Sequence, residues 1–262
     1  MTSLMDYPPL VFVVAFFGLW FAAWIGAVRF KKLRSQAADM RDDFGIVQGA
    51  TLTLLGLIIG FTFSMALSRY DLRKNYEEQE ANAIGTEFVR ADLLPAADAA
   101  KVRSLLLKYL EQRALFYTTR DAQVLMQVNA STAQLQAELW GAVVPPATAQ
   151  PTPLSALVVA GMNDVLNTQG YTQAAWWNRI PIAAWALMST IALVSTMLVG
   201  VGARTARAES ALLVILPLVI AIAFFLIADI DSPRGGVIRV SPQNMKSLSE
   251  SLRTTPAAPV AK

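Results

Sequence analysis

Four stretches of the chain are apolar, contain no Asp, Glu, Lys or Arg, and are long enough to cross a bilayer as helices. A helix of about 20 apolar residues spans the hydrocarbon core of a membrane. The pattern therefore predicts an all-α membrane protein with four transmembrane helices. The four spans are Leu10 to Val28 (10–28), Ile46 to Leu67 (46–67), Ile180 to Ala203 (180–203) and Ala211 to Ala228 (211–228).

The second span continues without a proline into a charged sequence. The pattern from residue 44 to residue 94 predicts one helix. Such a helix would be about 75 Å long at roughly 1.5 Å per residue, whereas the hydrocarbon core is only about 30 Å thick. Its carboxyl-terminal half should therefore leave the bilayer and join an aqueous helical domain.

That helical extramembrane domain is predicted between the second and third spans. Apolar residues recur at helical spacing in Ala96 to Arg120, and further helices are expected from Ala122 to Val143 and from Leu154 to Asn178. Residues 145–153 contain four prolines and predict an extended linker. The predicted organisation is a first membrane hairpin (1–68), the inserted domain (69–178), a second membrane hairpin (179–230) and an extramembrane tail (231–262) with a short helix from Met245 to Leu252.

Basic residues in the two short loops predict an orientation. Lys and Arg are enriched in the cytoplasmic loops of membrane proteins. Both short loops should then be cytoplasmic, with the termini and the inserted domain outside the cell (inner) membrane. The first loop holds Arg29, Lys31, Lys32, Arg34 and Arg41, and the last loop holds Arg204 and Arg207.

Composition narrows the function. Hydrophobic residues make up 55% of the chain and charged residues only 16%, so membrane lipid is an expected partner. The chain has no His and no Cys, which removes thiol chemistry, histidine catalysis and the usual zinc and haem sites. We therefore expect no enzyme, no metal and no cofactor. Nucleic acid is not an expected partner, because the basic residues flank spans, where topology accounts for them.

One face of the second span is made of small and hydroxyl-bearing residues. Gly56 and Gly60 form a GxxxG pair, so the face could be a packing seam, with Gly18, Ala22 and Gly26 of the first span as its counterpart. Alternatively, an oligomer could bring copies of the face together around a narrow pore. The small-residue face comprises Gly49, Thr53, Gly56, Leu57, Gly60, Ser64 and Ser68, with Phe61 at its rim.

Charged residues follow the second span. Glu77, Glu78, Glu80 and Glu87 are predicted to form a solvated helix face, with Lys74 and Glu78 as an (i, i+4) pair. No two of these carboxylates stand apart as a catalytic pair.

Two acidic residues end the fourth span. Asp229 and Asp231 are expected at the membrane interface, where a charge costs less than inside the bilayer. Arg234 and Arg239 are close enough in sequence to pair with them. We predict a structural clasp between the tail and the membrane edge.

Two motifs carry a resemblance to a known family. QEANAIGTEFVRADLLP (79–95) and DIDSPRGGVIRVSP (229–242) resemble the bacterial bestrophin-like family of four-span membrane proteins, whose function is largely undefined. A weaker similarity links GFTFSMALSRY (60–70) to the pore helix of true bestrophins, which are pentameric anion channels. This resemblance implies that Thr53, Leu57 and Phe61 take the neck positions of a pore and that Arg69 takes the arginine at its cytosolic end.

The chain also departs from true bestrophins. Tyr70 and Asp71 replace an aromatic pair, and the acidic calcium clasp has no clear counterpart. The bestrophin arrangement would place the inserted domain and both termini in the cytosol, opposite to the orientation that the loop charges predict. Both topologies stay open at this point.

Two functional hypotheses remain. The first is an oligomeric anion channel, or a channel-like protein, with a pore lined by the second span; a small anion would be its ligand and further copies of the chain its partners. The alternative is a non-conducting membrane scaffold or sensor whose helical middle domain binds a partner or ligand. Ion flux distinguishes the two.

Overall fold

The computed structural model describes residues 4–29, 41–202 and 208–254. Contacts within the chain divide it into two compact units. Both ends of the inserted segment fall at the border between them. We call residues 1–70 with 179–239 the membrane unit, and residues 71–178 with 240–262 the extramembrane unit.

Several predictions concern residues outside this description. The basic residues of the two short loops from Lys31 to Arg34 and from Arg204 to Arg207 lie there, as does the tail beyond Thr254. The orientation that these loops predict therefore stays a prediction. The domain boundaries proposed from the sequence also stay predictions.

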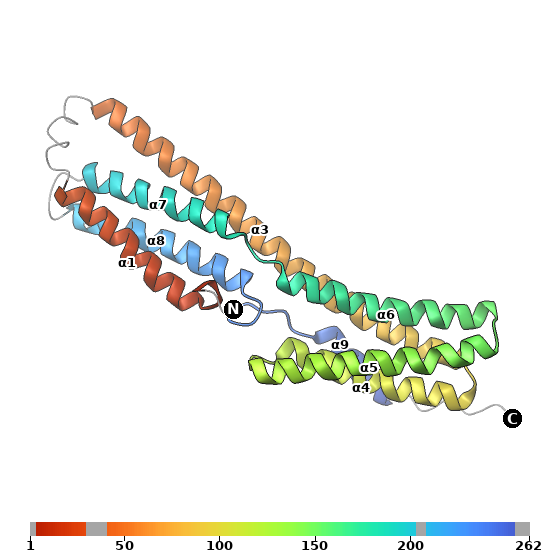
Figure 1. Cartoon of the computed structure of the whole chain (residues 1–262). Helices are drawn as coiled ribbons and strands as arrows, with labels where there is room; N and C mark the ends of the chain where they lie inside the picture. The colour runs from red at the N-terminus through yellow and green to blue at the C-terminus, as the bar shows by residue number, and fades with distance from the viewer. Residues whose placement is uncertain (1–3, 30–40, 203–207, 255–262) are drawn as a thin grey trace. The chain divides into compact units, whose positions relative to one another are not determined.

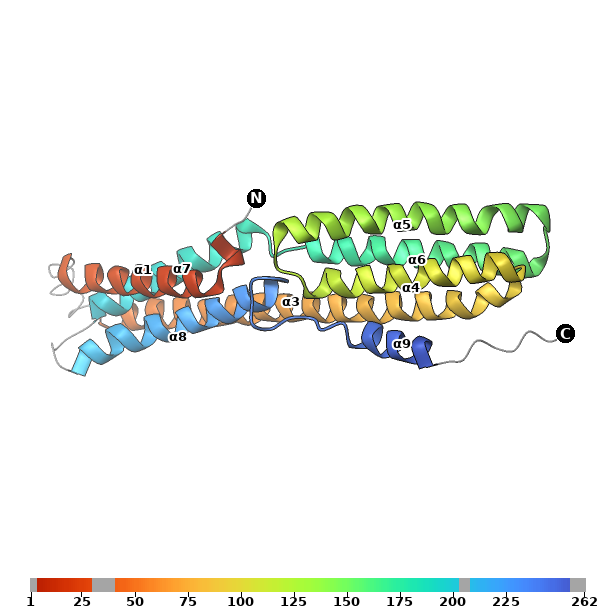
Figure 2. The ribbon, with the colours of Figure 1, turned by 90° about the horizontal axis from the view of Figure 1, so that it is seen from below.

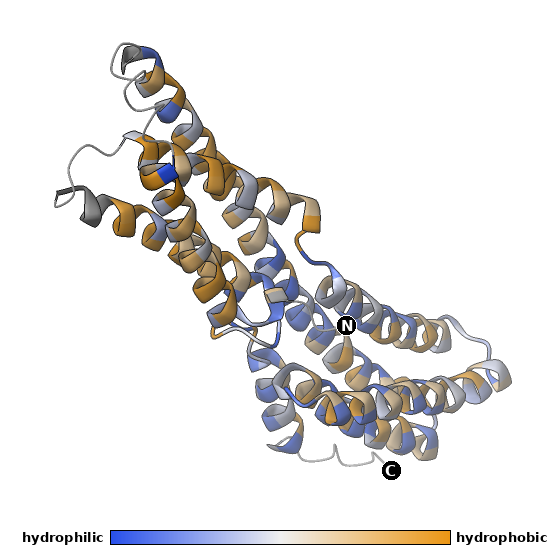
Figure 3. Ribbon diagram, turned by 60° about the vertical axis from the view of Figure 1, so that its left-hand side comes forward, coloured by the Kyte–Doolittle hydropathy of each residue, from blue (hydrophilic) through white to orange (hydrophobic). Residues whose placement is uncertain are grey.

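The membrane unit contains the four predicted spans. Each is a helix long and apolar enough to cross a membrane, which confirms the four-span fold. Figure 3 shows apolar residues around these helices, whereas hydrophilic residues recur along the helices of the extramembrane unit. In Figure 1 the helices that form the membrane unit are α1 (Pro8–Arg29), the first part of α3 (Arg41–Arg90), α7 (Ile182–Gly202) and α8 (Ala208–Asp231).

Helix α3 is uninterrupted from Arg41 to Arg90, which confirms the single long helix predicted for residues 44 to 94. A short 3₁₀ turn, η2 (Ala91–Leu93), follows it. Leu94 is extended (φ −91°, ψ 162°), as expected before a proline, because the ring of Pro95 disfavours the helical conformation in the residue before it. Helix α3 contributes its first part to the membrane unit and its last part to the extramembrane unit.

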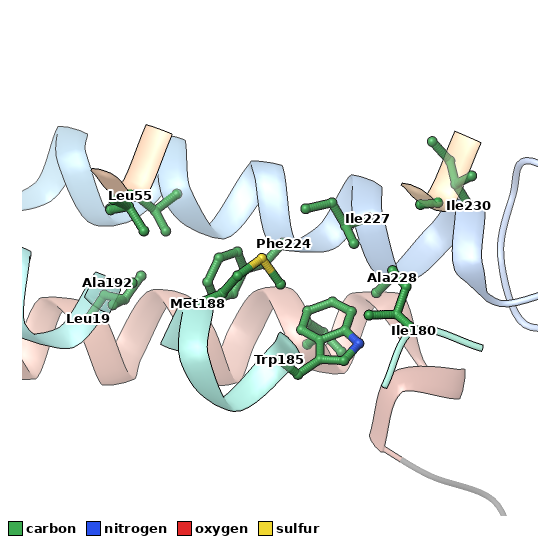
Figure 4. Close-up of a cluster of buried hydrophobic side chains, with 13 residues drawn as sticks. Leu19, Leu55, Ile180, Trp185, Met188, Ala192, Phe224, Ile227, Ala228 and Ile230 are labelled. Atoms are coloured by element: carbon green, nitrogen blue, oxygen red, sulfur yellow. The ribbon is translucent and has the colours of Figure 1, made fainter. Parts of the chain in front are cut away.

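The core of the membrane unit lies between α1, α3, α7 and α8 (Figure 4). Trp185 of α7 meets the ring of Phe224 of α8 edge-on, with 6.0 Å between ring centroids. Met188 and Ile227 are fully buried beside them. Helix α3 joins this core through Leu55 and Ala66, which are 2% and 0% exposed. The side of α3 that carries these two residues is thus its packed side.

Helices α1 and α7 approach each other through glycines. A Cβ added at Gly26 would collide with the backbone carbonyl of Met197, and one added at Gly200 with that of Ala23. Small residues allow this close approach because they leave no side chain between the backbones. Of the small residues on the first span, Gly26 therefore packs against α7, whereas Gly18 stays exposed. The expected counterpart, the GxxxG pair of α3, has no atom within 4 Å of a Cβ added at Gly56 or Gly60.

The extramembrane unit is a bundle of helices around the last part of α3. Figures 1 and 2 show the helices labelled α4 (Ala96–Thr118), α5 (Ala122–Ala149) and α6 (Pro153–Trp177) running alongside the last part of α3, together with the shorter α9 (Gln243–Thr254). Tyr76 of α3 stacks on Tyr171, with 5.9 Å between centroids, and Phe116 packs against Trp176 at 4.9 Å.

The predicted extended linker over residues 145–153 is mostly helical. Helix α5 continues through Pro145 and Pro146 to Ala149. Each proline removes one backbone N–H donor, so α5 continues here without two of its hydrogen bonds. Pro146 itself accepts a hydrogen bond from the backbone N–H of Gln150, 3.1 Å away. The non-helical segment is therefore short, and Thr152 then caps α6 through its side chain.

The solvated glutamate face predicted on α3 is wrong for three of its four residues. Glu77, Glu80 and Glu87 are 1%, 0% and 0% exposed, and only Glu78 is exposed. With Arg73, which is 1% exposed, the buried residues recur three, four or seven apart and share one face of α3. Residues of other helices bury this face. The spacing of charges along α3 alone could not reveal that burial, because the covering residues are distant in sequence.

Candidate functional site

The small-residue face of α3 is exposed in the membrane unit. Leu57 and Phe61 are 52% and 64% exposed, the largest apolar side chains of the face and its rim. Thr53, Ser64 and Ser68 are also exposed. Added Cβ atoms at Gly49, Gly56 and Gly60 would meet nothing within 4 Å.

The exposed face lies opposite the packed side of α3. At about 100° per residue, Gly60 and Ser64 lie roughly half a turn around the helix from Leu55 and Thr62. Thr62 is 3% exposed, and its hydroxyl donates to the carbonyl of Ile58 at 2.8 Å. The Thr62 hydroxyl on the packed side is therefore buried, whereas the hydroxyl-bearing residues of the small-residue face are exposed.

The hydroxyl groups of this face differ in what they can still bind. The Thr53 hydroxyl donates to the carbonyl of Gly49 at 2.9 Å, so its oxygen remains free to accept. Ser64 and Ser68 are exposed, and each carries a hydroxyl that can donate or accept. From Ile46 to Ser68 the helix carries no ionisable side chain. The face therefore offers neutral polar groups to whatever covers it.

A network of charged residues lies at the end of the membrane unit where α3 continues beyond Ser68. Arg179 donates through Nε to Asp231 at 2.9 Å and through Nη1 to Asp6 at 2.8 Å. Asp231 is 1% exposed and also accepts from the backbone N–H of Ile180 at 3.2 Å. Arg69, the first charged residue after the face, lies 3.8 Å from Asp231. Arg69 is therefore held on the packed side of α3.

Asp229 fixes the turn after α8. Its two carboxylate oxygens accept from the backbone N–H groups of Val237 and Ile238 at 2.7 and 2.8 Å. Asp229 is 2% exposed, so these bonds satisfy a buried carboxylate. The participation of Arg234 and Arg239 in a clasp stays a prediction.

Sequence reasoning missed Arg179 as a partner of Asp231. The two are far apart in the chain, and only the folding of α7 against α8 brings them together. A usable signal was present, because Arg179 directly precedes the third span and Asp231 follows the fourth at the same end of the hairpin. An acidic and a basic residue at adjacent span ends favour pairing.

A second buried network holds the extramembrane unit together. The Glu80 carboxylate pairs with Arg113 and accepts from the hydroxyls of Tyr117 at 3.2 Å and Thr172 at 3.1 Å. Burial, and then the charge of Glu80, raises the pKa of Tyr117, so its hydroxyl remains a donor. Arg113 also lies over the ring of Phe116, 4.4 Å from its centroid. Helices α3, α4 and α6 are tied together by this single carboxylate.

Comparison with known proteins identifies the family. The Bestrophin-like domain matches residues 11–245, which is most of the sequence. The chain belongs to the Bestrophin-like family. No curated protein sequence matches it.

Solved structures share the fold of this Bestrophin-like chain. A bacterial bestrophin homologue from Klebsiella pneumoniae matches with a TM-score of 0.64 and 13% identity, over 92% of this chain and 95% of that chain. A single-substitution variant of a bacterial bestrophin homologue from the same organism matches with a TM-score of 0.62 and 12% identity, over 92% and 96% of the two chains. At these identities the likeness shows the fold alone. The Bestrophin-like resemblance drawn from residues 79–95 and 229–242 is confirmed.

Proposed function

We propose that this membrane protein is the subunit of an oligomeric anion channel, or a channel-like protein, in which copies of α3 surround a pore with their small-residue faces. The observation that carries the proposal is the exposure of that face, with Leu57 at 52% and Phe61 at 64%, directly opposite the packed side of α3. An oligomer would cover it. Membership of the Bestrophin-like family supports this assignment.

Each part of the face has a role in the proposal. Thr53, Leu57 and Phe61 would form successive constrictions, about one helical turn apart. Gly60 would allow neighbouring helices to approach closely. Ser64 and Ser68 would offer hydroxyl donors to a small anion, which needs donors to replace its hydration shell.

Arg69 follows this face at the mouth of the proposed pore. Its Nη1 has no hydrogen-bond partner in the described part of the chain, while Asp231 lies 3.8 Å away. The arginine would add positive potential at the mouth without entering the pore, and Asp231 would limit that potential. Arg69 would attract an anion, and Asp231 would weaken that attraction. The anion would then be held weakly rather than bound tightly, as conduction requires.

Exposed hydroxyls argue against lipid as the cover of this face. The lipid-facing surfaces of spans are apolar, whereas polar side chains within spans usually face other helices or water. Residues on the flanks of the face are apolar and exposed, among them Leu54 and Met65 at 46% and 39%. The apolar flanks could therefore contact lipid or a neighbouring subunit, and the small-residue face would contact water.

We propose the cell (inner) membrane as the location, with the extramembrane unit and both termini in the cytosol. The family resemblance supports this orientation. The charge of the two short loops supports the opposite one, but basic residues are also frequent close to the other ends of the spans. Arg69, Arg73, Lys74, Arg179, Arg234 and Arg239 lie there.

The alternative, a non-conducting scaffold or sensor, has one observation in its favour. The extramembrane unit carries a groove of about 850 Å³ between α5 and α6, lined mainly by apolar side chains that include Trp140, Val144 and Val159. Such a groove could receive an apolar segment of a partner. In neither function do the described side chains act as catalysts, and we propose that the protein is not an enzyme.

Chloride flux tests the proposed function. Purified full-length protein, shown to be oligomeric, is reconstituted in liposomes, and chloride efflux is measured after a voltage is applied with valinomycin. We expect efflux, with Leu57→Ala and Phe61→Ala changing its rate at least threefold. Met65→Ala, on the flank of α3, is the matched control and should leave the rate unchanged. A folded oligomer that passes no chloride would refute the channel and leave the scaffold.

A further inference from the structure

Glu87 is a carboxylate that is buried where α3 meets α6. It lies on α3 in the extramembrane unit and is 0% exposed. Neither of its carboxylate oxygens has a hydrogen-bond partner among the described residues. An ionised carboxylate in such a place is strongly disfavoured, because it has lost water and gained no donor. Glu80 and Glu77, on the same face of α3, both have donors.

Glycine at position 161 makes the burial possible. A Cβ added there would collide with the carboxylate of Glu87 and the guanidinium of Arg90. The two side chains therefore lie directly against α6 where that helix has no side chain of its own. Arg90 crosses the same point, and its Nη1 lies 3.5 Å from the carbonyl of Leu157. The contact between α3 and α6 is close at this position because Gly161 leaves room for both groups.

Few charged groups surround this contact. Arg90 on α3 and Asp164 on α6 act on Glu87 from the two helices that meet there. The next element, η2, carries Asp92, which pairs with Arg103 of α4. Burial raises the pKa of Glu87 to about 8; Arg90 lowers it and Asp164 raises it. Arg90 thus favours the ionised form of Glu87, and its Nη1 also approaches the carbonyl of Leu157.

We propose that the contact between α3 and α6 at Gly161 is a proton-dependent latch, which is closed while Glu87 carries a proton and loosens when Glu87 ionises. A neutral carboxyl group can remain against Gly161 with only weak polar demands. An ionised one needs hydrogen-bond donors or water, and the closed contact gives neither of its oxygens a donor among the described residues. The latch belongs to the extramembrane unit alone and does not depend on whether the protein conducts.

The direction of the pH effect follows from the two states. In the unfolded or opened segment Glu87 ionises near its ordinary pKa of about 4.5. The closed contact holds the proton more tightly, so closing is most favourable below about pH 4.5 and becomes steadily less favourable as the pH rises to about 8. Above that value both states are ionised and no further change is expected. Physiological pH therefore lies in the range over which the closing of the contact depends on pH.

Hydrogen–deuterium exchange tests the latch in the full-length protein in detergent. Exchange of the amides in residues 153–165 is measured at pH 6, 7, 8 and 9 and corrected for the intrinsic pH dependence of amide exchange. We expect the protection factor to fall at least tenfold between pH 6 and pH 9. Constant protection in the natural sequence would overturn the proposal, and this result needs no variant.

Two variants separate the proton from general packing. Glu87→Gln has the shape of the protonated residue but cannot ionise, so it should hold protection high at every pH. Glu78→Gln, which alters an exposed glutamate nine residues earlier on α3, is the matched control and should keep the natural pH dependence. If Glu87→Gln shows the same fall as the natural chain, another group titrates and the latch is refuted.

Discussion

Glu80 and Arg113 form an ion pair in which both side chains are 0% exposed. Helix α3 supplies the acid and α4 the base, and α6 contributes a hydroxyl through Thr172. Charges removed from water in this way stabilise a fold only while they are paired and hydrogen-bonded. The pair is therefore a sensitive point of the extramembrane unit.

Replacing Arg113 by methionine should destabilise the extramembrane unit by about 3–5 kcal/mol, since it leaves the Glu80 carboxylate buried without its counter-charge. Thermal unfolding followed by circular dichroism, in detergent, measures the change. Arg253→Met is the matched control, because Arg253 pairs with Glu111 at the surface, where both side chains are more than half exposed. It should cost less than about 1 kcal/mol. The double variant Arg113→Met with Glu80→Gln should recover part of the lost stability. Equal losses of stability in Arg113→Met and in the control Arg253→Met would contradict the buried pairing.

Gly200→Ala should weaken the membrane unit, because the added methyl group would collide with the backbone carbonyl of Ala23. Forcing two packed helices apart typically costs about 1–3 kcal/mol. Gly18→Ala is the control, since a Cβ at Gly18 would meet nothing within 4 Å. The temperature of aggregation in detergent should fall for Gly200→Ala and stay constant for Gly18→Ala. The reverse order would mean that α1 and α7 do not meet at these glycines.

The position of the extramembrane unit can be read from a single introduced cysteine, because the chain has none of its own. Gln123→Cys lies at an exposed position near the start of α5. We expect a membrane-impermeant maleimide to label it only after the cells are permeabilised. Ser35→Cys, in the loop between the first two spans, should show the opposite behaviour. Labelling of Gln123→Cys in intact cells would reverse the proposed orientation.

The sequence predicted those features that depend on local pattern. Uncharged apolar stretches located the four spans, and the absence of proline between Phe44 and Leu94 indicated one continuous helix. The two prolines at 145 and 146 were misleading, because a helix whose neighbouring turns are packed can continue through a proline despite the lost hydrogen bond, as α5 does next to the buried Ala142 and Val143.

Features that depend on partners distant in sequence could not be predicted in this way. Glu80 and Glu87 look alike along the chain, yet Glu80 pairs with Arg113 of α4, whereas Glu87 lies against Gly161 of α6 and accepts no hydrogen bond from the described residues. Similarly, Gly26 of the first span gave no indication whether α3 or α7 would pack against it. For the small-residue face, the pattern located the residues, and the fold added that the face is left exposed.

In the assembled protein, we propose, copies of this exposed face of α3 surround water. The most direct measurement is the reaction of single cysteines with a charged, water-soluble methanethiosulfonate reagent in the reconstituted oligomer. Ser64→Cys lies on the face, and Met65→Cys is also exposed in one subunit but lies on the flank. We predict that Ser64→Cys reacts and that its chloride flux changes, while Met65→Cys does not react. Failure of Ser64→Cys to react in a folded oligomer would contradict the claim and indicate a dry packing surface.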